Sequence, residues 1–401
     1  MQHSYKLLTV AIAVALSLSA CSKKEEANTA AADAQSNASA TNNVIKIGHS
    51  APLTGGIAHL GKDNENGARL AVEEINKAGG LNVGGTTYTL ELMGEDDAAD
   101  PKTGKIVAQK MVDSKVIGVV GHLNSGVSIP ANEVYAQAGI VQVSPSSTNP
   151  KYTIDGKKTS GGLTTSYRVV ATDAQQGPAL AMYAFNTLKA KNIAVIDDAT
   201  EYGKGLADTV ERVSKEKGMK VVAREATTST ATDFKAILTK IKAKNPDVVM
   251  FGGMDDAAAK IAMQMKQLGI KARLMSGDGA CTDKFVELAK DAANGLVCSE
   301  AGMPLSQMVK GADFESKYKA RFNTSVQIYA PFSYDAVYVI AEAIKAAGAV
   351  DSIKVLEQMP KVKYSGVTGD IAFDEKGDLK QGAITVYEVK DNKKSVAEIV
   401  K

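Results

Sequence analysis

Residues 88–121 read YTLELMGEDDAADPKTGKIVAQKMVDSKVIGVVG, and this stretch decides the fold class. Tyr88–Met93 and Val116–Gly121 are short runs rich in apolar and β-branched residues, which predicts two strands. Pro101–Asp113 between them predicts a helix, because an Asp precedes it as a cap and a Pro opens it. The near-continuous apolar character of the second run predicts a parallel strand that is covered on both faces. The stretch is therefore a βαβ unit.

The same alternation extends through the chain on both sides of this unit. Further strands are expected at Val44–His49, Ile140–Val143, Ile193–Ile196, Lys220–Ala223, Val248–Phe251 and Arg273–Met275. Further helices are expected at Asp63–Ala78, Val127–Ala138, Gly177–Leu188, Tyr202–Lys217, Phe234–Lys244 and Ala257–Leu268. Because the rhythm restarts after Arg168, we expect two doubly wound, Rossmann-like α/β lobes. Ligands of such sheets bind beyond the carboxyl ends of the strands.

Composition excludes several classes of protein. The chain has 401 residues, and its 47 Lys and Arg against 45 Asp and Glu leave a net charge of +2, so no global field attracts nucleic acid or an anionic membrane. Aromatic residues make up 5% and Trp is absent, so stacking surfaces for bases or sugar rings are scarce. Three cysteines do not build a disulfide scaffold.

The first 43 residues are expected to lie outside the fold. A basic start at Lys6, an apolar run over Leu7–Leu18 and small residues before Cys21 predict a secretory signal peptide at 1–20. The apolar run is shorter than the roughly 20 residues that span a bilayer. The Leu-Ser-Ala-Cys sequence resembles a bacterial lipobox, which implies that Cys21 is lipidated; an ordinary signal peptide that contains a cysteine is the alternative. Polar residues from there to position 43 predict a disordered tether.

The candidate catalytic and phosphate-binding motifs of the sequence each lack a residue that their chemistry requires. Gly56–Asp63 nearly matches a phosphate-binding loop, but its last residue is Asp63, which offers magnesium no hydroxyl and repels phosphate. Gly203-Lys204-Gly205 lacks the third glycine of a dinucleotide fingerprint and is interpreted as a turn opening a helix. His122 and Ser125 lie three residues apart without a nucleophile-elbow motif, so we do not expect catalysis there. The spacing of His and Cys suits no metal.

Cys281 and Cys298 remain once Cys21 is assigned to the lipid. In an exported chain these two cysteines are expected to form a disulfide, and two buried free thiols are the alternative.

Several segments together resemble the leucine/isoleucine/valine-binding proteins of ABC importers, which are type I periplasmic binding proteins. The matching segments occur in family order at Gly67-Ala68, Asp96–Lys102, Gly121-His122-Leu123, Gln176-Gly177-Pro178, Tyr202–Ala207 and Asp374–Lys380.

The resemblance implies two lobes joined by a three-crossing hinge, with crossings near Thr172, Ala301 and Ala383. It places lobe 1 at 44–172 plus 302–383 and lobe 2 at 173–301 plus 384–401.

The resemblance also implies a site for a free amino acid. Ser125 matches the residue that binds the ligand carboxylate, and its place near a helix N-terminus suits an anion. Ser146 and Thr148 match residues that hold the carboxylate and the ammonium, and Asp278 matches the acid that pairs with the ammonium. Four further residues are expected at the ligand: Leu123, Tyr202, Leu60 and Met254.

Some positions depart from the family pattern. Leu60 stands where a first loop usually carries a bulky aromatic, and Met254 replaces an aromatic of the second lobe, which softens or enlarges the side-chain pocket. The acid is Asp rather than Glu, and the cysteines of some relatives map to Ala99 and Asn124. A pocket that tolerates aromatic ligands is therefore a hypothesis beside branched-chain specificity.

Taken together, the resemblance implies a non-catalytic, lipid-anchored receptor that delivers an L-amino acid to ABC permease subunits. We expect a monomer outside the cytoplasm with no cofactor, no metal and no nucleic-acid partner, touching the membrane through its lipid only. A sensory or regulatory receptor for an amide or another small metabolite is the alternative, and an exported α/β enzyme is a third possibility.

Overall fold

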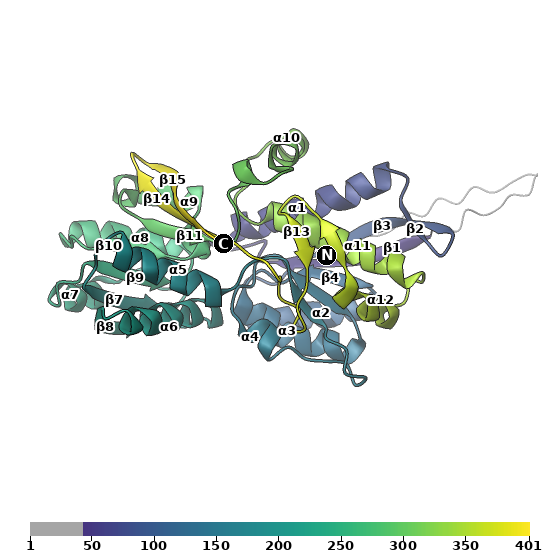
Figure 1. Cartoon of the computed structure of the whole chain (residues 1–401), viewed down its shortest axis with the longest axis horizontal. Coiled ribbons are helices and arrows are strands. Elements are labelled where there is room, and N and C mark those ends of the chain that lie inside the picture. The colour runs from purple at the N-terminus through teal and green to yellow at the C-terminus, as the bar shows by residue number, and fades with distance from the viewer. Residues whose placement is uncertain (1–42) are drawn as a thin grey trace, which may run out of the picture. The chain divides into compact units, whose positions relative to one another are not determined.

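The computed structural model describes residues 43–401. Residues 1–42 lie outside them, and with them the predicted signal peptide, Cys21 and all but the last residue of the predicted tether. Two α/β lobes make up the described part of the chain, each built on one sheet (Figure 1).

The sheet of the first lobe has six strands in the order β2-β3-β1-β4-β5-β6. They span Leu81–Val83, Thr86–Asp96, Val44–Ala51, Gly118–Gly121, Val141–Ser144 and Ser166–Arg168 in that order. All neighbours are parallel except β2 and β3, which form an antiparallel pair. Every residue of β4 and β5 is buried, as expected of parallel strands covered on both faces.

The sheet of the second lobe has seven strands in the order β15-β14-β11-β10-β9-β7-β8. They span Lys393–Val400, Ile384–Lys390, Val297–Glu300, Arg273–Ser276, Val248–Gly252, Asn192–Asp197 and Lys220–Ala226 in that order. The strands from β11 to β8 are parallel, and the hairpin of β14 and β15 adds an antiparallel edge.

Helices cover both sheets. In the first lobe they are α1 (Ala58–Lys77), α2 (Pro101–Asp113), α3 (Ser125–Ala138), α4 (Lys151–Ile154), α10 (Gly311–Phe322), α11 (Ala330–Ala347) and α12 (Ser352–Gln358). In the second lobe they are α5 (Asp173–Asn186), α6 (Glu201–Glu216), α7 (Lys235–Lys242), α8 (Asp255–Gln267) and α9 (Asp283–Ala289). Short 3₁₀ turns lie at Asp278–Ala280, Lys290–Ala293, Leu305–Gln307 and Met359–Lys361, and β12 (Lys363–Ser365) pairs with β13 (Asp370–Ala372).

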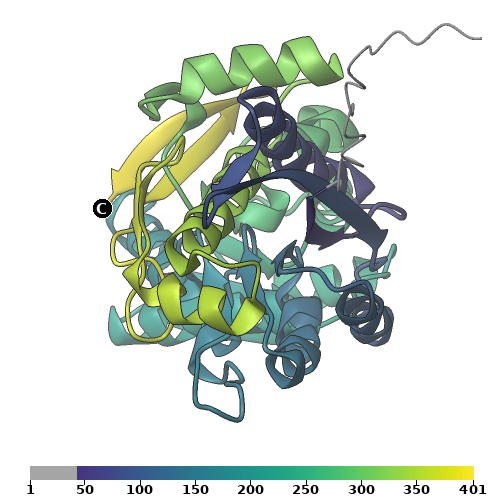
Figure 2. The ribbon, with the colours of Figure 1, turned by 90° about the vertical axis from the view of Figure 1, so that its right-hand side faces the viewer.

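Segments far apart in sequence share a lobe. Helix α11 packs against α1 and β4, so the chain returns to the first lobe after β11, as the yellow-green helices beside the purple and blue segments show (Figure 2). The yellow β14–β15 hairpin then joins β11 in the second lobe (Figure 1).

The three passages of the chain between the sheets lie side by side. The Ala171 N–H donates to the Ala301 carbonyl at 3.3 Å, and the Thr385 hydroxyl donates to the Gly302 carbonyl at 2.7 Å. Because three adjacent strands of chain connect the lobes, relative motion of the lobes bends all three together.

The strand and helix positions expected from sequence agree with the structure, apart from shifts at their ends and the start of α1. That helix begins at Ala58 rather than at Asp63, so Leu60 lies inside a helix and not in a loop. The sequence pattern had assigned no element after Arg273–Met275, where the structure has α9 to α12 and β11 to β15. Across residues 43–401, no helix combines the length and the apolarity that crossing a membrane requires.

Candidate ligand-binding site

The two lobes meet at the carboxyl ends of their strands, where the connecting loops carry the predicted site residues. Nine residues surround a small cavity of about 10 Å³ there: Leu123, Asn124, Ser125, Ser146, Tyr202, Met254, Asp278, Gly279 and Tyr329. Six of the eight residues expected at the ligand are among them. This volume is close to that of one water-sized probe, so an amino acid reaches these residues only when the lobes separate.

The first lobe contributes hydroxyl groups at the start of a helix. Ser125 is the first residue of α3, and its Oγ accepts the backbone N–H of Asn149 at 3.2 Å. The Ser146 hydroxyl donates to the Leu123 carbonyl at 3.3 Å, which ties the loop after β5 to the loop after β4. Because the first N–H groups of a helix lack partners within it, this corner suits a carboxylate.

The second lobe contributes a buried carboxylate. Asp278 follows β10 and is 1% exposed. Its Oδ1 accepts the Tyr202 hydroxyl at 2.8 Å and the Gln176 side-chain amide at 2.9 Å. Burial raises the pKa of Asp278, and the hydrogen bonds from Tyr329, Gln176 and Tyr202 oppose that rise. No basic side chain within residues 43–401 forms an ion pair with this carboxylate, so a ligand ammonium would compensate its charge.

Tyr329 was not predicted from the sequence. It precedes α11 in the first lobe, and its hydroxyl donates to Asp278 Oδ2 of the second lobe at 2.7 Å. Gln176 was not predicted as a site residue either, and its side-chain oxygen accepts the Asp278 backbone N–H at 3.1 Å. Pro331 gives a local signal for a helix start beside Tyr329, but no local signal predicts the contact between Tyr329 and Asp278.

Two predicted residues lie beside the cavity and do not line it. Leu60 is fully buried and packs in an apolar cluster with Leu123, Ile328, Tyr329 and Met254. Thr148 is also buried, and its hydroxyl lies close enough to the Asp173 carboxyl group to oppose the rise of that group's pKa. Its carbonyl accepts the backbone N–H of Asp173 at 2.9 Å. Leu60 therefore supports the apolar wall, whereas Thr148 offers a buried hydroxyl close to the site.

Asp173 places a second buried carboxyl group near Asp278. The Gln176 amide donates to Asp173 Oδ1 and to Asp278 Oδ1, both at 2.9 Å, so one donor serves two acids. Burial, reinforced by the negative charge of Asp278, raises the pKa of Asp173 to about 7. A negative charge on Asp278 therefore disfavours a second negative charge on Asp173.

Other contacts join the lobes outside the cavity. His59 Nε2 of α1 lies 2.8 Å from Asp255 Oδ2 of α8, and the Thr282 hydroxyl donates to the same oxygen at 2.7 Å. The Lys151 ammonium lies 3.0 Å from the Glu201 carboxylate. The structure is therefore that of lobes in mutual contact.

The motifs rejected as catalytic have structural roles. Gly56–Asp63 runs into α1 and forms no phosphate loop. Gly203 lies in the first turn of α6 against Gly252 of β9, where an added Cβ would come within 2.4 Å of the Gly252 carbonyl oxygen. His122 has its ring nitrogens 2.8 Å from Asp97 Oδ2 and 3.0 Å from the Tyr135 hydroxyl, so neither is directed at Ser125. The described residues contain no group of three His, Cys, Asp or Glu side chains that fits a metal ion.

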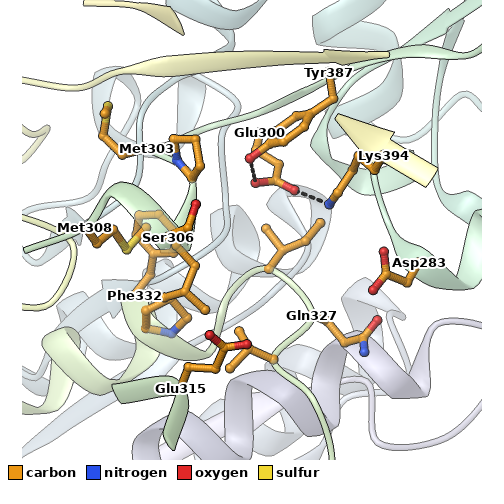
Figure 3. Close-up of a pocket in the computed structure, with 16 residues that line it drawn as sticks. Asp283, Glu300, Met303, Ser306, Met308, Glu315, Gln327, Phe332, Tyr387 and Lys394 are labelled. Atoms are coloured by element: carbon orange, nitrogen blue, oxygen red, sulfur yellow. Dashed lines mark hydrogen bonds and ion pairs between the residues drawn. The ribbon is translucent and has the colours of Figure 1, made fainter. Parts of the chain in front are cut away.

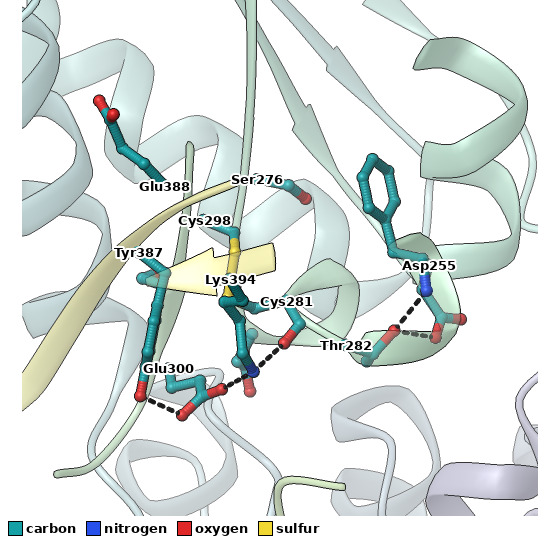
Figure 4. Close-up of a disulfide and its surroundings, with 12 residues drawn as sticks. Asp255, Ser276, Cys281, Thr282, Cys298, Glu300, Tyr387, Glu388 and Lys394 are labelled. Atoms are coloured by element: carbon teal, nitrogen blue, oxygen red, sulfur yellow. Dashed lines mark hydrogen bonds and ion pairs between the residues drawn. A yellow bond between two sulfur atoms is a disulfide. The ribbon is translucent and has the colours of Figure 1, made fainter. Parts of the chain in front are cut away.

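Cys281 and Cys298 are joined by a disulfide three residues after Asp278 (Figure 4). The Lys394 ammonium donates to the Cys281 carbonyl at 2.9 Å and pairs with Glu300 at 2.5 Å. The segment that follows Asp278 is therefore tied to β11 and to β15.

A larger cavity of about 280 Å³ lies on the hinge side and contains none of the predicted ligand residues (Figure 3). Glu300 in its wall already accepts the Tyr387 hydroxyl at 2.9 Å and pairs with Lys394. Its volume does not make it the better candidate, because the buried Asp278 carboxylate without a described cation lies in the smaller cavity.

Comparison with known proteins agrees with this geometry. The family model for periplasmic binding proteins matches residues 44–394. A Leu/Ile/Val-binding protein homolog 1 from Brucella abortus is 36% identical over 344 residues, covering 86% of this chain and 90% of the relative. A leucine-, isoleucine-, valine-, threonine- and alanine-binding protein from Pseudomonas aeruginosa is 36% identical, covering 86% and 89%.

Solved structures give the same result. The leucine-binding protein LivK from Thermotoga maritima superposes with a TM-score of 0.81 at 27% identity, covering 89% of this chain and 98% of its own. LivJ from Streptococcus pneumoniae in complex with isoleucine has a TM-score of 0.79 at 28% identity, covering 89% and 99%. The chain belongs to the periplasmic binding protein family, in the Leu/Ile/Val-binding group of ABC transporter substrate-binding proteins, whose members bind substrates rather than catalyse reactions.

Proposed function

We propose that this protein captures a free L-α-amino acid with an apolar side chain between its lobes and delivers it to the permease of an ABC transporter. The observation that carries the proposal is the buried Asp278 carboxylate, which three neutral donors hold and no described cation neutralises. A buried charge without a counter-ion is costly, and an ammonium group is the ligand that relieves this cost.

The opposite end of the ligand would bind the first lobe. Ser125 and Ser146 present hydroxyl groups beside the N-terminus of α3, and Thr148 adds a buried hydroxyl. Hydroxyl groups and free backbone N–H groups are suitable donors to a carboxylate. The zwitterion would then bridge the two lobes, with its carboxylate on one and its ammonium on the other.

The side chain would contact the apolar cluster of Leu60, Leu123, Ile328, Tyr329 and Met254. Related proteins are named for binding leucine, isoleucine and valine, and aliphatic walls suit such side chains. Because Leu60 and Met254 are flexible or smaller than aromatic residues, the pocket would also adapt to Phe or Tyr.

Ligand binding would be coupled to closure. The cavity between the lobes is too small for an amino acid, so the ligand would bind when the lobes are apart. A ligand that touches both lobes favours the closed arrangement, because it gains contacts there that the open one lacks. We propose that lobe 1 comprises residues 44–172 and 302–383 and lobe 2 residues 173–301 and 384–401, which the three adjacent passages near Ala171, Ala301 and Thr385 support.

We further propose that the protein is a membrane-anchored lipoprotein that acts as a monomer at the permease. The anchor is supported by three sequence features: the apolar run over Leu7–Leu18 after Lys6, the Leu-Ser-Ala sequence before Cys21 and the polar stretch that ends at residue 43. A disulfide between Cys281 and Cys298 suits an oxidising compartment. Labelling with a radioactive fatty acid, compared between the wild type and Cys21→Ala, tests the anchor.

Isothermal titration of the mature protein against all proteinogenic amino acids tests the proposed ligand class. We expect binding of leucine, isoleucine or valine, or of phenylalanine or tyrosine if the pocket is wider. Failure to bind any of the twenty would contradict the proposal.

A further inference from the structure

Asp63 stands where a phosphate-binding loop would have Ser or Thr. In the structure it is a buried acceptor of hydrogen bonds. It lies in α1, is 2% exposed and accepts hydrogen bonds from the segment before α11. Its Oδ2 accepts the backbone N–H groups of Ile328 at 3.1 Å, Tyr329 at 2.8 Å and Ala330 at 2.9 Å. Its Oδ1 accepts the N–H of Gln327 and the hydroxyl of Tyr318, both at 3.0 Å.

Neutral donors hold this carboxylate, and no basic side chain of residues 43–401 pairs with it. Burial raises the pKa of Asp63, and the four backbone N–H groups oppose that rise. A carboxylate at the start of a helix also interacts favourably with the helix dipole. The N–H groups at the start of α11 thus receive their acceptor from a residue more than 260 positions earlier in the chain.

The segment that Asp63 holds carries the cross-lobe contact of the site. Tyr329 donates its hydroxyl to Asp278 Oδ2 at 2.7 Å, while Asp63 fixes the backbone of the same tyrosine. The next residue, Asn64, donates to Ser146 Oγ at 3.2 Å. Two adjacent residues of α1 therefore support the tyrosine that reaches the second lobe and a serine of the first.

We propose that Asp63 is a positioning residue for the ligand site, which sets affinity by holding the Tyr329 hydroxyl against Asp278 although Asp63 itself does not touch the cavity. The claim that Asp63 sets affinity rests on the proposed function, because it requires a ligand that binds at Asp278 when the lobes close. The geometric part concerns Tyr329 alone and holds with or without that ligand.

Affinity is tested with a double-mutant cycle. Asp63→Asn places an amide NH₂ among N–H donors and disturbs the loop, so we expect leucine to bind about tenfold more weakly, as the loss of one hydrogen bond to a charged group implies. Tyr329→Phe should have a similar effect, and the double variant should be no weaker than either single one. Equal affinity of Asp63→Asn and the wild type, or an Asp63→Asn effect that is undiminished in the Tyr329→Phe background, would overturn the proposal.

Asp335→Asn is the matched control. Asp335 lies further along α11, is also buried, and accepts the N–H groups of Val367 at 2.9 Å and Thr368 at 2.8 Å, away from the site. This variant should unfold at lower denaturant concentration and keep the wild-type affinity. A loss of affinity equal to that of Asp63→Asn would show a general effect of destabilised folding.

A second readout needs no ligand. In protein labelled with 3-fluorotyrosine, the ¹⁹F signal of Tyr329, assigned by its loss in Tyr329→Phe, should shift in Asp63→Asn and not in Asp335→Asn. If Asp63→Asn does not fold, Tyr318→Phe removes one donor to the same carboxylate and should shift the signal less. An unmoved signal in Asp63→Asn would overturn the proposal. If the wild-type protein binds no amino acid while the signal still shifts in Asp63→Asn, only the proposed function is overturned.

Discussion

The two lobes supply opposite halves of the site by different physical means. The first lobe presents neutral hydroxyl groups at the start of α3, where the carboxylate end of a ligand would bind. The second lobe presents a charge, the Asp278 carboxylate, with Tyr202 and Gln176 as donors from its own side. A helix N-terminus is already suited to an anion without a ligand, whereas a buried carboxylate is costly without a cation. The second lobe should therefore be the more sensitive to ligand charge.

The largest effect should come from neutralising the charged half. Asp278→Asn removes the proposed partner of the ammonium, and we expect leucine to bind about 100-fold more weakly or worse, because the proposed buried ion pair loses one member. Titration calorimetry measures this loss. Folding should not suffer, since the variant no longer buries a charge.

The matched control is Asp208→Asn, an acid of the same lobe on the surface of α6 that pairs with Lys204. It should leave the affinity unchanged. Wild-type affinity in Asp278→Asn would contradict the assignment of the ammonium to this residue.

A smaller effect is expected in the neutral half. Ser125→Ala removes one proposed donor to the ligand carboxylate while the backbone N–H groups of α3 remain, so affinity should fall about tenfold. Measured with leucine by calorimetry, the loss should be smaller than that of Asp278→Asn. If Ser125→Ala were the more damaging change, the contrast between the lobes would be reversed.

Removing the contact between His59 and Asp255 tests closure of the lobes without changing a residue at the proposed ligand site. His59→Ala removes a cross-lobe contact at a partly exposed position, so we expect about a threefold loss of affinity. Small-angle scattering should show a larger fraction of separated lobes at subsaturating leucine. Replacing Lys105, which pairs with Glu133 inside the first lobe, by Ala should change neither quantity.

The smallest effect on affinity, but a distinct effect on stability, is expected at Asp173. Its pKa in the folded protein is about 7 and lies above its ordinary value of 3.8, so the folded state holds the proton more tightly than the unfolded state. The stability that this proton contributes is present below pH 3.8 and is lost as the pH rises towards 7. In Asp173→Asn, the free energy of unfolding should therefore decrease less between pH 3.8 and pH 7 than it does in the wild type. Urea titration at several pH values measures this quantity. A wild-type pH dependence in the variant would contradict the raised pKa.

Much of the fold follows from local sequence patterns, and the structure explains where those patterns stop. Helix α2 was predicted with its observed bounds because Asp100 caps it and Pro101 opens it. Helix α11 was not predicted, and it is buried along most of its length, so it lacks the polar stripe that marks a surface helix.

The site shows the same limit. Asp278 was identifiable because it follows a strand between two glycines and matches a family position. Tyr329 was not, because its role depends on a contact between lobes and not on its neighbours in sequence. The role of Asp63 was not predictable from its neighbours in sequence, since all its partners lie more than 250 residues away.

The central claim is that the ligand ammonium pairs with Asp278 in the second lobe. Calorimetric titration of the wild-type protein with L-leucine and with 4-methylpentanoate, which lacks only the amino group, tests it most directly. We predict that leucine binds and that 4-methylpentanoate binds about 100-fold more weakly or not at all, because the buried carboxylate then stays without a cation. Equal affinity for the two compounds would contradict the account.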